Sequence, residues 1–431
     1  METEGLYNLF LKYRKVTTDS RKVEQDAIFF ALKGENFNGN SYASVALDNG
    51  CSYAVIDEDR YCTSDRHILV ADVLTVLQQL AAHHRKHFRF PVIGITGTNG
   101  KTTTKELIHA VLSQKYNVMS TKGNFNNHIG VPLTLLAMNE TLEFGVVEMG
   151  ANHPGEIEAL CKIAQPGYGL ITNIGKAHIE GFGSFEGVVR TKKELYDYIF
   201  DSSGKVFINT DSPILTNLVR GKETIGYGTI KKNWCTGKCA GADPFLELKW
   251  STCNRIYGSA TTRLIGGYNF ENALAAVCVG AWFGVDATAI KTALESYLPS
   301  DNRSQIVKTN RDNTLLLDAY NANPTSMHAA ILNFHNMNSK DKVLIIGDML
   351  ELGTIGPVEH ERILTFAADK GFGRIMTVGP LFAQAGKRKN CKAFNDIEEL
   401  QTWLRNNPIH ASTILLKASR GISLEKVVEY L

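Results

Sequence analysis

The sequence has little excess charge, no long apolar run and no secretory signal. Its 431 residues carry a formal net charge of +2, whereas nucleic-acid-binding domains usually have a marked basic surplus, so we expect no nucleic-acid partner. The first thirty residues lack a charged segment followed by an apolar one, as a signal peptide would require. No apolar run approaches the ~20 residues of a membrane span. We therefore expect a cytoplasmic protein with no membrane span.

The eight cysteines are scattered and form no recognisable framework. The nearest pair in sequence, Cys235 and Cys239, has no second pair at zinc-finger spacing. Reduced thiols in a cytoplasm explain this distribution, and we expect no disulfides. The length of 431 residues is too great for one hydrophobic core and indicates about three domains, while 44% apolar and 21% charged residues are typical of an ordinary globular protein.

Alternating strand-like and helix-like segments predict an α/β fold in three domains. Residues 1 to 88 contain short apolar runs around a Gly/Asn-rich turn and predict a small α/β domain. Residues 89 to 300 alternate strands and helices, which indicates a mostly parallel sheet, with an antiparallel excursion at residues 220 to 265. Residues 301 to 431 contain four buried-type strands separated by helical segments, the pattern of a Rossmann-like domain.

The helix predicted at residues 77 to 90 carries two histidines four positions apart. His83 and His87 could therefore pair on one face as metal ligands. Arg85, Lys86 and Arg89 surround them, and we favour a basic, solvated helix face for all five residues.

The stretch "PVIGITGTNGKTTTKELI" resembles a phosphate-binding loop but lacks its first glycine. In the usual pattern G-x-x-x-x-G-K-[ST], that glycine would stand where Ile95 is. Most glycine-rich turns bind nothing, but this one ends a buried strand and opens a helix, where unpaired N–H groups and the helix dipole favour phosphate. Gly97 and Gly100 would allow close approach, Lys101 would reach the outer phosphates, and Thr102 would bind Mg²⁺.

Polar residues follow several other predicted strands of the central domain. Glu148 ends the strand "FGVVEM" at the edge where ligands bind in open α/β sheets. Such a residue is often a cap or an ion-pair partner, but beside a phosphate loop we favour a Mg²⁺ ligand. His178 follows the next strand, and Lys192 and Lys193 follow on a helix. From the residues alone, both a structural and a catalytic role remain open for these three.

The third domain places polar loops at the same edge of its sheet. Asp318 ends an apolar strand, and Asn321, Asn323 and Ser326 follow it around Pro324. An Asn/Pro segment is usually only a turn. The strings "GDMLELG" and "LLKASRG" follow two later strands, however, and the set as a whole indicates a ligand edge.

These strings together resemble the Mur ligase family, the ATP-dependent ligases of peptidoglycan precursor synthesis. The phosphate loop of that family has the pattern G-[TS]-x-G-K-[TS], so the absence of the earlier glycine, at position 95, is a family trait. The further matches are "TTDSRKV", "GENFNGN", "GNFNNHIGVPLTLL", "VVEMGANHPGEI", "TNIGKAHIEGFGS", "DAYNANPTSM", "GDMLELG" and "KASRG", in order along the whole chain. The D-x-Y-N-A-N-P string favours the members that add a dipeptide over the preceding ligase, whose D-[ND]-P-R signature is absent. Folylpolyglutamate synthase shares the core but lacks the N-terminal domain.

The resemblance implies a three-substrate reaction. ATP phosphorylates the terminal carboxylate of a UDP-N-acetylmuramoyl tripeptide, and the amino group of D-alanyl-D-alanine attacks the acyl phosphate, leaving ADP and phosphate. Such chemistry depends on charge neutralisation and alignment. The family uses Mg²⁺, with two ions expected, and we expect a monomer.

The resemblance also implies roles for residues that match family motifs. Lys101, Glu148, His178 and Lys192 would be catalytic. Thr102 and Glu148 would hold the first Mg²⁺, and His178 with a carbamylated Lys192 the second, although Lys193 remains an alternative to Lys192. ATP would contact Gly97, Thr98, Asn99, Gly100, Lys101, Thr102, Thr103, Asn272, Arg303 and Asp318. The UDP-linked substrate would contact Ser20, Arg21, Lys33, Gly34, Asn124, Asn126 and Asn127, and the dipeptide Asn321, Asn323, Ser419 and Arg420.

The chain departs from the family pattern at three places, none in the phosphate or metal set. Phe37-Asn38-Gly39-Asn40 replaces F-D-G-H, Tyr268 replaces the histidine of H-N-x-x-N, and Ala418 replaces the glycine of K-G-S-R.

Two alternative functions remain. One is a non-catalytic nucleotide-binding regulator, which loss of Lys101, Glu148 or Lys192 would have favoured, and the other is a ligase for another amine. The third residue of the tripeptide, meso-diaminopimelate or lysine, and the open or closed domain arrangement remain undetermined.

Overall fold

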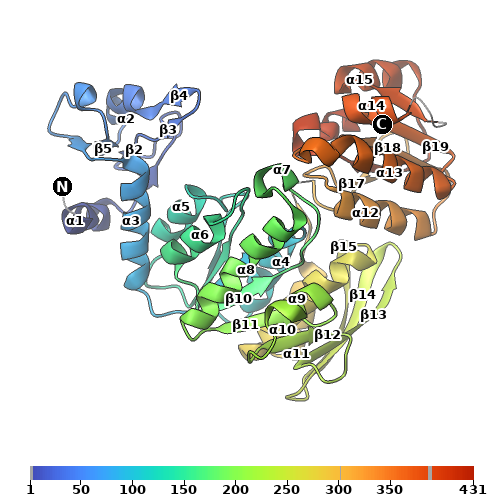
Figure 1. Cartoon of the computed structure of the whole chain (residues 1–431), viewed down its shortest axis with the longest axis horizontal. Helices are drawn as coiled ribbons and strands as arrows, with labels where there is room; N and C mark the ends of the chain where they lie inside the picture. Colours follow the sequence, from blue (N-terminus) through green and yellow to red (C-terminus); the bar gives the residue numbers. More distant parts are fainter. Residues whose placement is uncertain (1–2, 301, 387–390) are drawn as a thin grey trace.

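The computed structural model describes residues 3–300, 302–386 and 391–431 and contains three α/β bodies. Figure 1 shows the central domain flanked by the N-terminal and C-terminal domains, which rise from it as two separate arms. The sequence-based prediction of an α/β fold with mostly parallel sheets is confirmed. No helix in the described part of the chain combines the length and apolar character that a bilayer span requires.

The N-terminal domain is built on a four-stranded parallel sheet in the order β1-β2-β5-β6. Its elements are α1 (Thr3–Tyr13), β1 (Val16–Thr17), β2 (Ile28–Phe30), the antiparallel pair β3 (Lys33–Gly34) and β4 (Phe37–Asn38), α2 (Ala43–Asp48), β5 (Tyr53–Ile56), β6 (His67–Leu69) and α3 (Val73–Lys86). The apolar runs that predicted strands form the buried strands β2 and β5.

Helix α3 joins this domain to the central one, and one residue of its basic cluster is not solvated. The prediction of a solvated face is wrong for Arg85, which is buried and donates hydrogen bonds to the backbone oxygens of Phe88 (2.8 Å) and Ala164 (3.1 Å). The physical reason is that α3 packs against α5 and α6 of the central domain, where carbonyl groups at helix ends need donors. Lys86 and Arg89 are exposed as expected.

The neighbouring His84, for which the sequence pattern predicts no particular environment, is also buried in this junction. Its Nδ1 lies 3.2 Å from the Tyr7 hydroxyl, and its Nε2 lies 3.0 Å from the backbone oxygen of Met138. The rings of His83 and His87 pack against the Tyr7 ring, with centroids 4.5 Å and 4.7 Å apart. Both rings thus contact one aromatic side chain, while His87 remains exposed, as expected for a solvated helix face.

The central domain has a nine-stranded sheet in the order β15-β14-β13-β12-β11-β10-β7-β9-β8, antiparallel only across β13, β14 and β15. Helices α5, α6 and α8 cover one face, and α4, α10 and α11 cover the other, each with its own apolar core. The elements are β7 (Val92–Thr96), α4 (Lys101–Leu112), β8 (Val118–Ser120), α5 (Gly130–Leu136), β9 (Phe144–Glu148), α6 (Glu156–Ala164), β10 (Tyr168–Ile171), α7 (Ile179–Phe182), α8 (Phe185–Asp201), β11 (Lys205–Asn209), α9 (Pro213–Leu218), β12 (Ile225–Gly228), β13 (Cys235–Ala242), β14 (Phe245–Thr252), β15 (Tyr257–Ile265), α10 (Phe270–Trp282) and α11 (Ala287–Ser296).

The C-terminal domain has a six-stranded sheet in the order β16-β17-β21-β18-β19-β20, parallel except for β16. The four predicted strands are β17 (Thr314–Leu317), β18 (Lys342–Gly347), β19 (Arg374–Val378) and β21 (Thr413–Lys417); the helices are α12 (Pro324–Asn336), α13 (Gly356–Asp369), α14 (Pro380–Gly386) and α15 (Ile397–Asn406). The two unpredicted strands, β16 (Gln305–Lys308) and β20 (Lys392–Phe394), lie at the sheet edges and carry no fully buried run.

Candidate active site

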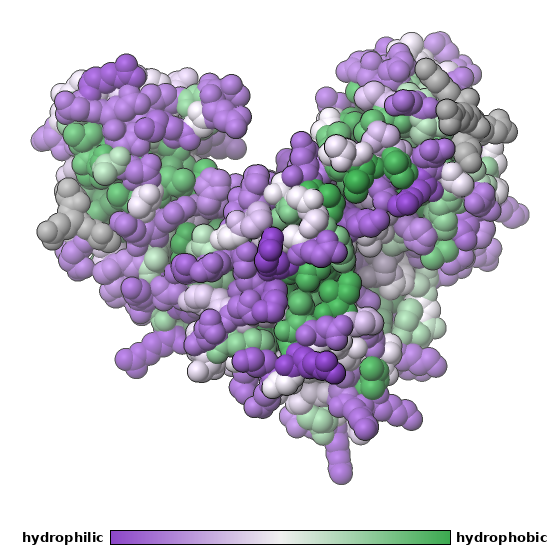
Figure 2. All heavy atoms as spheres, in the orientation of Figure 1, coloured by the Kyte–Doolittle hydropathy of each residue, from purple (hydrophilic) through white to green (hydrophobic). Residues whose placement is uncertain are grey.

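A cavity of about 960 Å³ lies where the ligand edge of the central sheet faces the C-terminal domain. It is lined by the phosphate loop, the segments after β9 and β10, and the loops after β17, β18 and β21, with Gln78 of α3 at one side. Figure 2 shows the surface hollowed between the two outer domains. Loops from separate domains thus meet at one site, as expected for parallel sheets that present their carboxyl ends to a ligand.

The geometry of the phosphate loop explains which positions need glycine. Gly97 and Gly100 have φ values of +143° and +76°, which favour glycine. A Cβ at Gly97 would lie 2.0 Å from Thr172 Oγ1, and one at Gly100 would lie 2.5 Å from Asn272 Oδ1. Ile95, by contrast, is a fully buried residue inside β7. A glycine there would remove core packing and is not needed for the turn.

Two sets of hydrogen bonds hold the phosphate loop in shape. The Asn173 side chain accepts a hydrogen bond of 2.9 Å from the backbone N–H of Asn99. Lys101 Nζ donates to the backbone oxygens of Gly97 (2.8 Å) and Thr98 (3.2 Å), so the ammonium group folds over its own loop. The loop is therefore held in shape, and its lysine lies where a phosphate would bind.

Several cations converge on this cavity. Burial lowers the pKa of Lys101, while Glu148 raises it and Arg303 lowers it further. Burial, and then the charge of Lys101, lowers the pKa of Lys192 to about 7. The Arg303 guanidinium stacks on the Tyr320 ring, 3.4 Å from its centroid. Like charges held this close favour binding of an anion with several charges.

Glu148 supplies a buried carboxylate with one uncommitted oxygen. Its Oε1 accepts a hydrogen bond of 2.8 Å from Asn126 Nδ2, and its backbone N–H donates to Thr121 Oγ1 at 3.0 Å. Its Oε2 is buried and has no hydrogen-bond partner among the described residues. A buried carboxylate oxygen without a partner is costly, and a bound cation at this position would satisfy it.

The residues at this site fit a metal ion whose ligands come partly from a nucleotide, rather than an ion bound by protein side chains alone. The described residues contain no group of three or more His, Cys, Asp or Glu side chains that could hold a metal ion. Mg²⁺ at nucleotide sites is typically bound by one or two protein oxygens, with phosphates and water completing the octahedron. Glu148 and the hydroxyl of Thr102, both on the cavity lining, match that requirement.

The two adjacent lysines of α8 have different environments. Lys192 is 3% exposed, lines the cavity and has its Nζ 5.4 Å from the centroid of the Phe182 ring. Within the described residues it has no carboxylate at ion-pair distance. Lys193 instead pairs with Asp197, one turn further along α8 at the surface. Only the first lysine is directed into the cavity.

His178 meets a residue of the C-terminal domain that the sequence did not single out. His178 Nδ1 lies 2.6 Å from Glu351 Oε2. This contact holds the pKa of the Glu351 carboxyl below its usual range. Glu351 belongs to the string "GDMLELG", which predicted a ligand edge as a whole but gave no reason to select this position.

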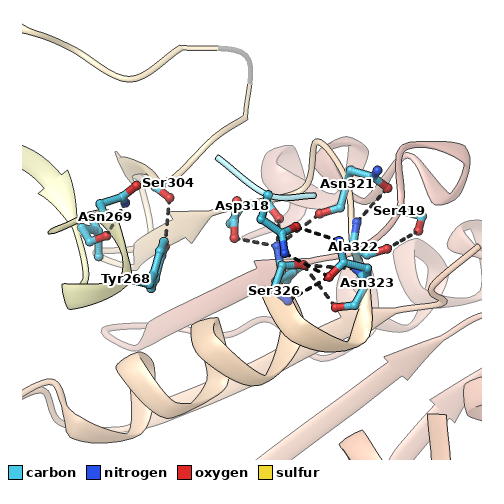
Figure 3. A network of polar contacts seen from close by, with 12 residues as sticks. Tyr268, Asn269, Ser304, Asp318, Asn321, Ala322, Asn323, Ser326 and Ser419 are labelled. Atoms are coloured by element: carbon cyan, nitrogen blue, oxygen red, sulfur yellow. Dashed lines mark hydrogen bonds and ion pairs between the residues drawn. The ribbon is translucent and has the colours of Figure 1, made fainter. Parts of the chain in front are cut away.

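The loops of the C-terminal domain are held together by side-chain bonds, which Figure 3 shows around Asp318 and Asn323. Lys417 Nζ pairs with Asp318 Oδ2 at 2.7 Å. Asn323 caps α12 in a reciprocal capping box with Ser326. The Ser419 hydroxyl accepts a hydrogen bond from the backbone N–H of Leu350 (2.9 Å) and donates one to the backbone oxygen of Ala322 (3.3 Å). These loops therefore form one preorganised unit.

Asparagine side chains connect the phosphate loop to its surroundings. Asn323 Nδ2 donates to Asn99 Oδ1 at 2.7 Å, which links the loop to the C-terminal domain. Asn272 Oδ1 accepts from Thr104 Oγ1 at 3.1 Å, and Asn272 Nδ2 donates to Asn269 at 2.9 Å. The residues named from the sequence thus also hold the site in shape.

Most of the site residues predicted from the sequence line this single cavity. They are Gly97, Thr98, Asn99, Gly100, Lys101, Thr102, Thr103, Asn124, Asn126, Asn127, Glu148, His178, Lys192, Asn272, Arg303, Asp318, Asn321, Asn323, Ser419 and Arg420. Ser20, Arg21, Lys33 and Gly34 do not line it and lie in the N-terminal domain. Arg21 pairs there with Asp19 at 2.9 Å, and Lys33 with Asp57 at 3.1 Å.

Sequence reasoning missed four residues that shape the cavity. Asn173 braces the phosphate loop, Tyr320 stacks with Arg303, Lys417 neutralises Asp318, and Glu351 contacts His178. All four lie inside strings quoted above, and Tyr320 directly precedes the selected Asn321. Their side chains have no chemistry that distinguishes them in sequence, and only spatial proximity identifies them.

Family models cover nearly the whole chain in three consecutive parts. They are the Mur ligase family catalytic domain at residues 12–85, the Mur ligase middle domain at 95–280, and the Mur ligase glutamate ligase domain at 302–420. The UDP-N-acetylmuramoyl-tripeptide–D-alanyl-D-alanine ligase of Bacillus subtilis is 37% identical, over 96% of this chain and 92% of its own. The chain belongs to the Mur ligase family.

Solved structures of Mur ligases match the same arrangement of domains. MurF from Acinetobacter baumannii has a TM-score of 0.87 at 30% identity, covering 96% of this chain and 92% of its own. MurF ligase from Thermotoga maritima, solved in complex with ADP, has a TM-score of 0.85 at 27% identity and covers 97% of both chains. The family expectation from the sequence motifs is thus confirmed.

Proposed function

We propose that this Mur ligase joins D-alanyl-D-alanine to the terminal carboxylate of a UDP-N-acetylmuramoyl tripeptide, with ATP converted to ADP and phosphate. The observation that carries the proposal is full-length similarity, across all three domains, to a relative with this name. The reaction is a step of peptidoglycan precursor synthesis, and we place it in the cytoplasm, where the UDP-linked substrate and ATP are available.

The first step is phosphorylation of the tripeptide carboxylate, and the phosphate loop provides its charge stabilisation. The backbone N–H groups of residues 98 to 103 hold the phosphates at the start of α4. Lys101 exchanges the carbonyl oxygens of its own loop for phosphate oxygens. Glu148 and Thr102 would hold Mg²⁺, which neutralises charge on the transferring phosphoryl group. The buried, unpaired Oε2 of Glu148 supports this role.

A second cation site next to the first would use His178 and Lys192. Lys192 is buried in the cavity without a carboxylate partner in the described chain, whereas Lys193 is in a surface ion pair. Carbamylation joins the Lys192 amine to CO₂ and releases one proton, which leaves an anionic carbamate. The carbamate supplies an oxygen ligand for a hard cation, and it also replaces repulsion between Lys101 and Lys192 by attraction.

The second step is attack of the dipeptide amine on the acyl phosphate. The loops that contain Asn321, Asn323, Ser419 and Arg420 line the same cavity as the phosphate loop and would bind the dipeptide. Asn272 would contact ATP beside Gly100, as would Arg303 and Asp318. Enclosure by the C-terminal domain keeps water from the acyl phosphate.

The long donor substrate would extend from this cavity to the N-terminal domain. Its UDP end would bind around Ser20, Arg21, Lys33 and Gly34, outside the cavity. Asn124, Asn126 and Asn127 line the intervening side of the cavity and would contact the sugar or its phosphates. We expect the chain to act as a monomer.

A product assay tests the proposed function. Purified protein, ATP, Mg²⁺, a UDP-N-acetylmuramoyl tripeptide and D-alanyl-D-alanine should yield the pentapeptide product with one ADP per bond formed. Single amino acids offered in place of the dipeptide should yield none, and tripeptides ending in meso-diaminopimelate or lysine should differ in KM. Product from a single amino acid but not from the dipeptide would indicate a different Mur-type ligase, and nucleotide binding without product would indicate a regulator.

A further inference from the structure

We propose that Glu351 is a positioning residue for His178, so that the C-terminal domain sets which nitrogen of this imidazole faces the cavity. The proposal rests on the proposed function, in which His178 is a ligand of the second cation. It adds a residue from another domain to that site and makes the site depend on how the two domains are docked.

The contact between the two side chains fixes the tautomer of the imidazole. His178 Nδ1 lies 2.6 Å from Glu351 Oε2. Because an ionised carboxylate only accepts hydrogen bonds, Nδ1 must carry the proton in this contact. In a neutral imidazole, Nε2 then keeps its lone pair and is free to bind a cation or its water. Metal-binding histidines are commonly oriented in this way by a carboxylate on the opposite nitrogen.

Both partners have an unusual backbone conformation at this contact. The φ of His178 is +51°, and the φ of Glu351 is +64°. Residues other than glycine rarely adopt left-handed conformations, and such residues concentrate at functional sites. Both residues also line the cavity, and neither is fully buried, with side-chain exposures of 26% and 55%. The imidazole and the carboxylate that meet here are thus both carried by residues in the left-handed region.

The position of Glu351 next to His178 depends on the interface between the central and C-terminal domains. Lys176 of the central domain pairs with Glu359 of the C-terminal domain at 3.0 Å. A Cβ at Gly353 would lie 3.4 Å from the Cβ of Glu180 in α7, and Figure 1 shows α7 beside the C-terminal domain. The segment that carries Glu351 is thus packed against the segment that carries His178. If the domains separate, the imidazole loses its orienting partner.

The Lys176–Glu359 pair provides a matched control. It crosses the same interface at a similar distance but does not touch His178. If Glu351 only held the domains together, Lys176→Gln and Glu351→Leu should have similar effects. If Glu351 orients the imidazole, only the substitution at Glu351 should weaken cation binding.

The test is an EPR titration of the full-length protein with Mn²⁺ in the presence of ADP and bicarbonate. This counts bound ions and measures their affinity without turnover. Glu351→Leu should weaken the second Mn²⁺ about 10- to 100-fold. Glu351→Gln should have a smaller effect, because its amide oxygen still accepts from Nδ1. His178→Ala should match Glu351→Leu, the double variant should be no worse than either, and Lys176→Gln should bind Mn²⁺ as the wild type does.

Three results would overturn the inference. Unchanged Mn²⁺ affinity in Glu351→Leu is one, and an equal loss in Lys176→Gln is another. The third is an increase in the KM for D-alanyl-D-alanine alone, which would make Glu351 a contact for the incoming ammonium group. A failure of the second cation site itself looks different: His178→Ala would leave Mn²⁺ binding unchanged, and both the metal role of His178 and this inference would be wrong.

Discussion

Individual residues of this site stand out by polar atoms that are buried but uncommitted. Glu148 Oε2 has no hydrogen-bond partner, and the Lys192 ammonium group has no carboxylate partner among the described residues. Burying such groups unpaired costs free energy, so the folded chain retains them at the expense of stability. Ligands of opposite charge pair with these groups when they bind and offset this loss of stability, as expected for a site that binds ATP and its cations.

Lys192 and Lys193 should separate cleanly in activity. We expect Lys192→Ala to lose roughly 100-fold or more in kcat/KM, because the ligand that we propose for the second cation is removed, and added bicarbonate should not restore it. Lys193→Ala should remain within a few-fold of wild type, since its partner is the surface residue Asp197. Steady-state ligase kinetics measure both. An active Lys192→Ala beside an inactive Lys193→Ala would show that the assignment is off by one residue.

Gly100 should be intolerant of a side chain because of contact as well as conformation. A Cβ there would lie 2.5 Å from Asn272 Oδ1 at a φ of +76°. We expect Gly100→Ala to weaken ADP binding by about tenfold or more, as the displaced loop loses its fit to phosphate. Gly123→Ala is the control, because Gly123 also has a positive φ (+52°) but no neighbour within 4 Å of the added atom. Calorimetric titration with ADP measures both; equal affinities would contradict the account.

At this scale the sequence named candidate site residues, most of which line one cavity in the structure, but it did not name their side-chain partners. The loop from Gly97 to Thr103 could be named because it ends a buried strand, opens a helix and carries Lys and Thr at the helix start. Lys192 could not be separated from Lys193, because both lie on one helix and only burial distinguishes their environments. Glu351 gave no signal, since its partner His178 is distant in sequence and in another domain.

At the scale of secondary structure, α3 shows what local pattern does and does not determine. Its amphipathic pattern predicted a helix, and the helix Val73–Lys86 is present. The pattern did not predict that Arg85 and His84 would face the central domain, because their burial depends on α5 and α6. The edge strands β16 and β20 were missed for a related reason. Each of these strands pairs with a neighbour on one side, and neither carries a continuous apolar run.

The α3 junction should make stability depend on pH through His84. Burial lowers the pKa of His84 below its ordinary value of 6.5. As pH falls below 6.5, the unfolded chain takes up a proton that the folded protein still excludes. The free energy of unfolding therefore decreases in that window, by at most about 1.4 kcal/mol per pH unit for this group. Between pH 7 and pH 5.5, His84→Gln should lose less stability than the wild type.

Thermal unfolding midpoints at the two pH values provide the measurement. His410→Gln, at an exposed residue of the C-terminal domain, is the control and should keep the pH dependence of the wild type. An equal pH dependence in His84→Gln and the wild type would show that this histidine does not govern the junction.

At the scale of the whole molecule, one cavity is assembled from loops at the ends of parallel strands in two domains. The sequence predicted this meeting in general terms, because strand–loop–helix units place their ligand edges on one side. It could not predict the contacts that close the site, such as Asn99 with Asn323 and Lys176 with Glu359, since these join residues far apart in the chain. Those contacts determine how the C-terminal domain covers the phosphate loop.

We propose that this cavity makes an acyl phosphate from the tripeptide carboxylate before the dipeptide attacks. The most direct test is transfer of ¹⁸O. A UDP-N-acetylmuramoyl tripeptide labelled with ¹⁸O in its terminal carboxylate should, on reaction with ATP and D-alanyl-D-alanine, give pentapeptide product and inorganic phosphate that contains one ¹⁸O atom per bond formed. Product accompanied by unlabelled phosphate, or ATP hydrolysis without product, would contradict it.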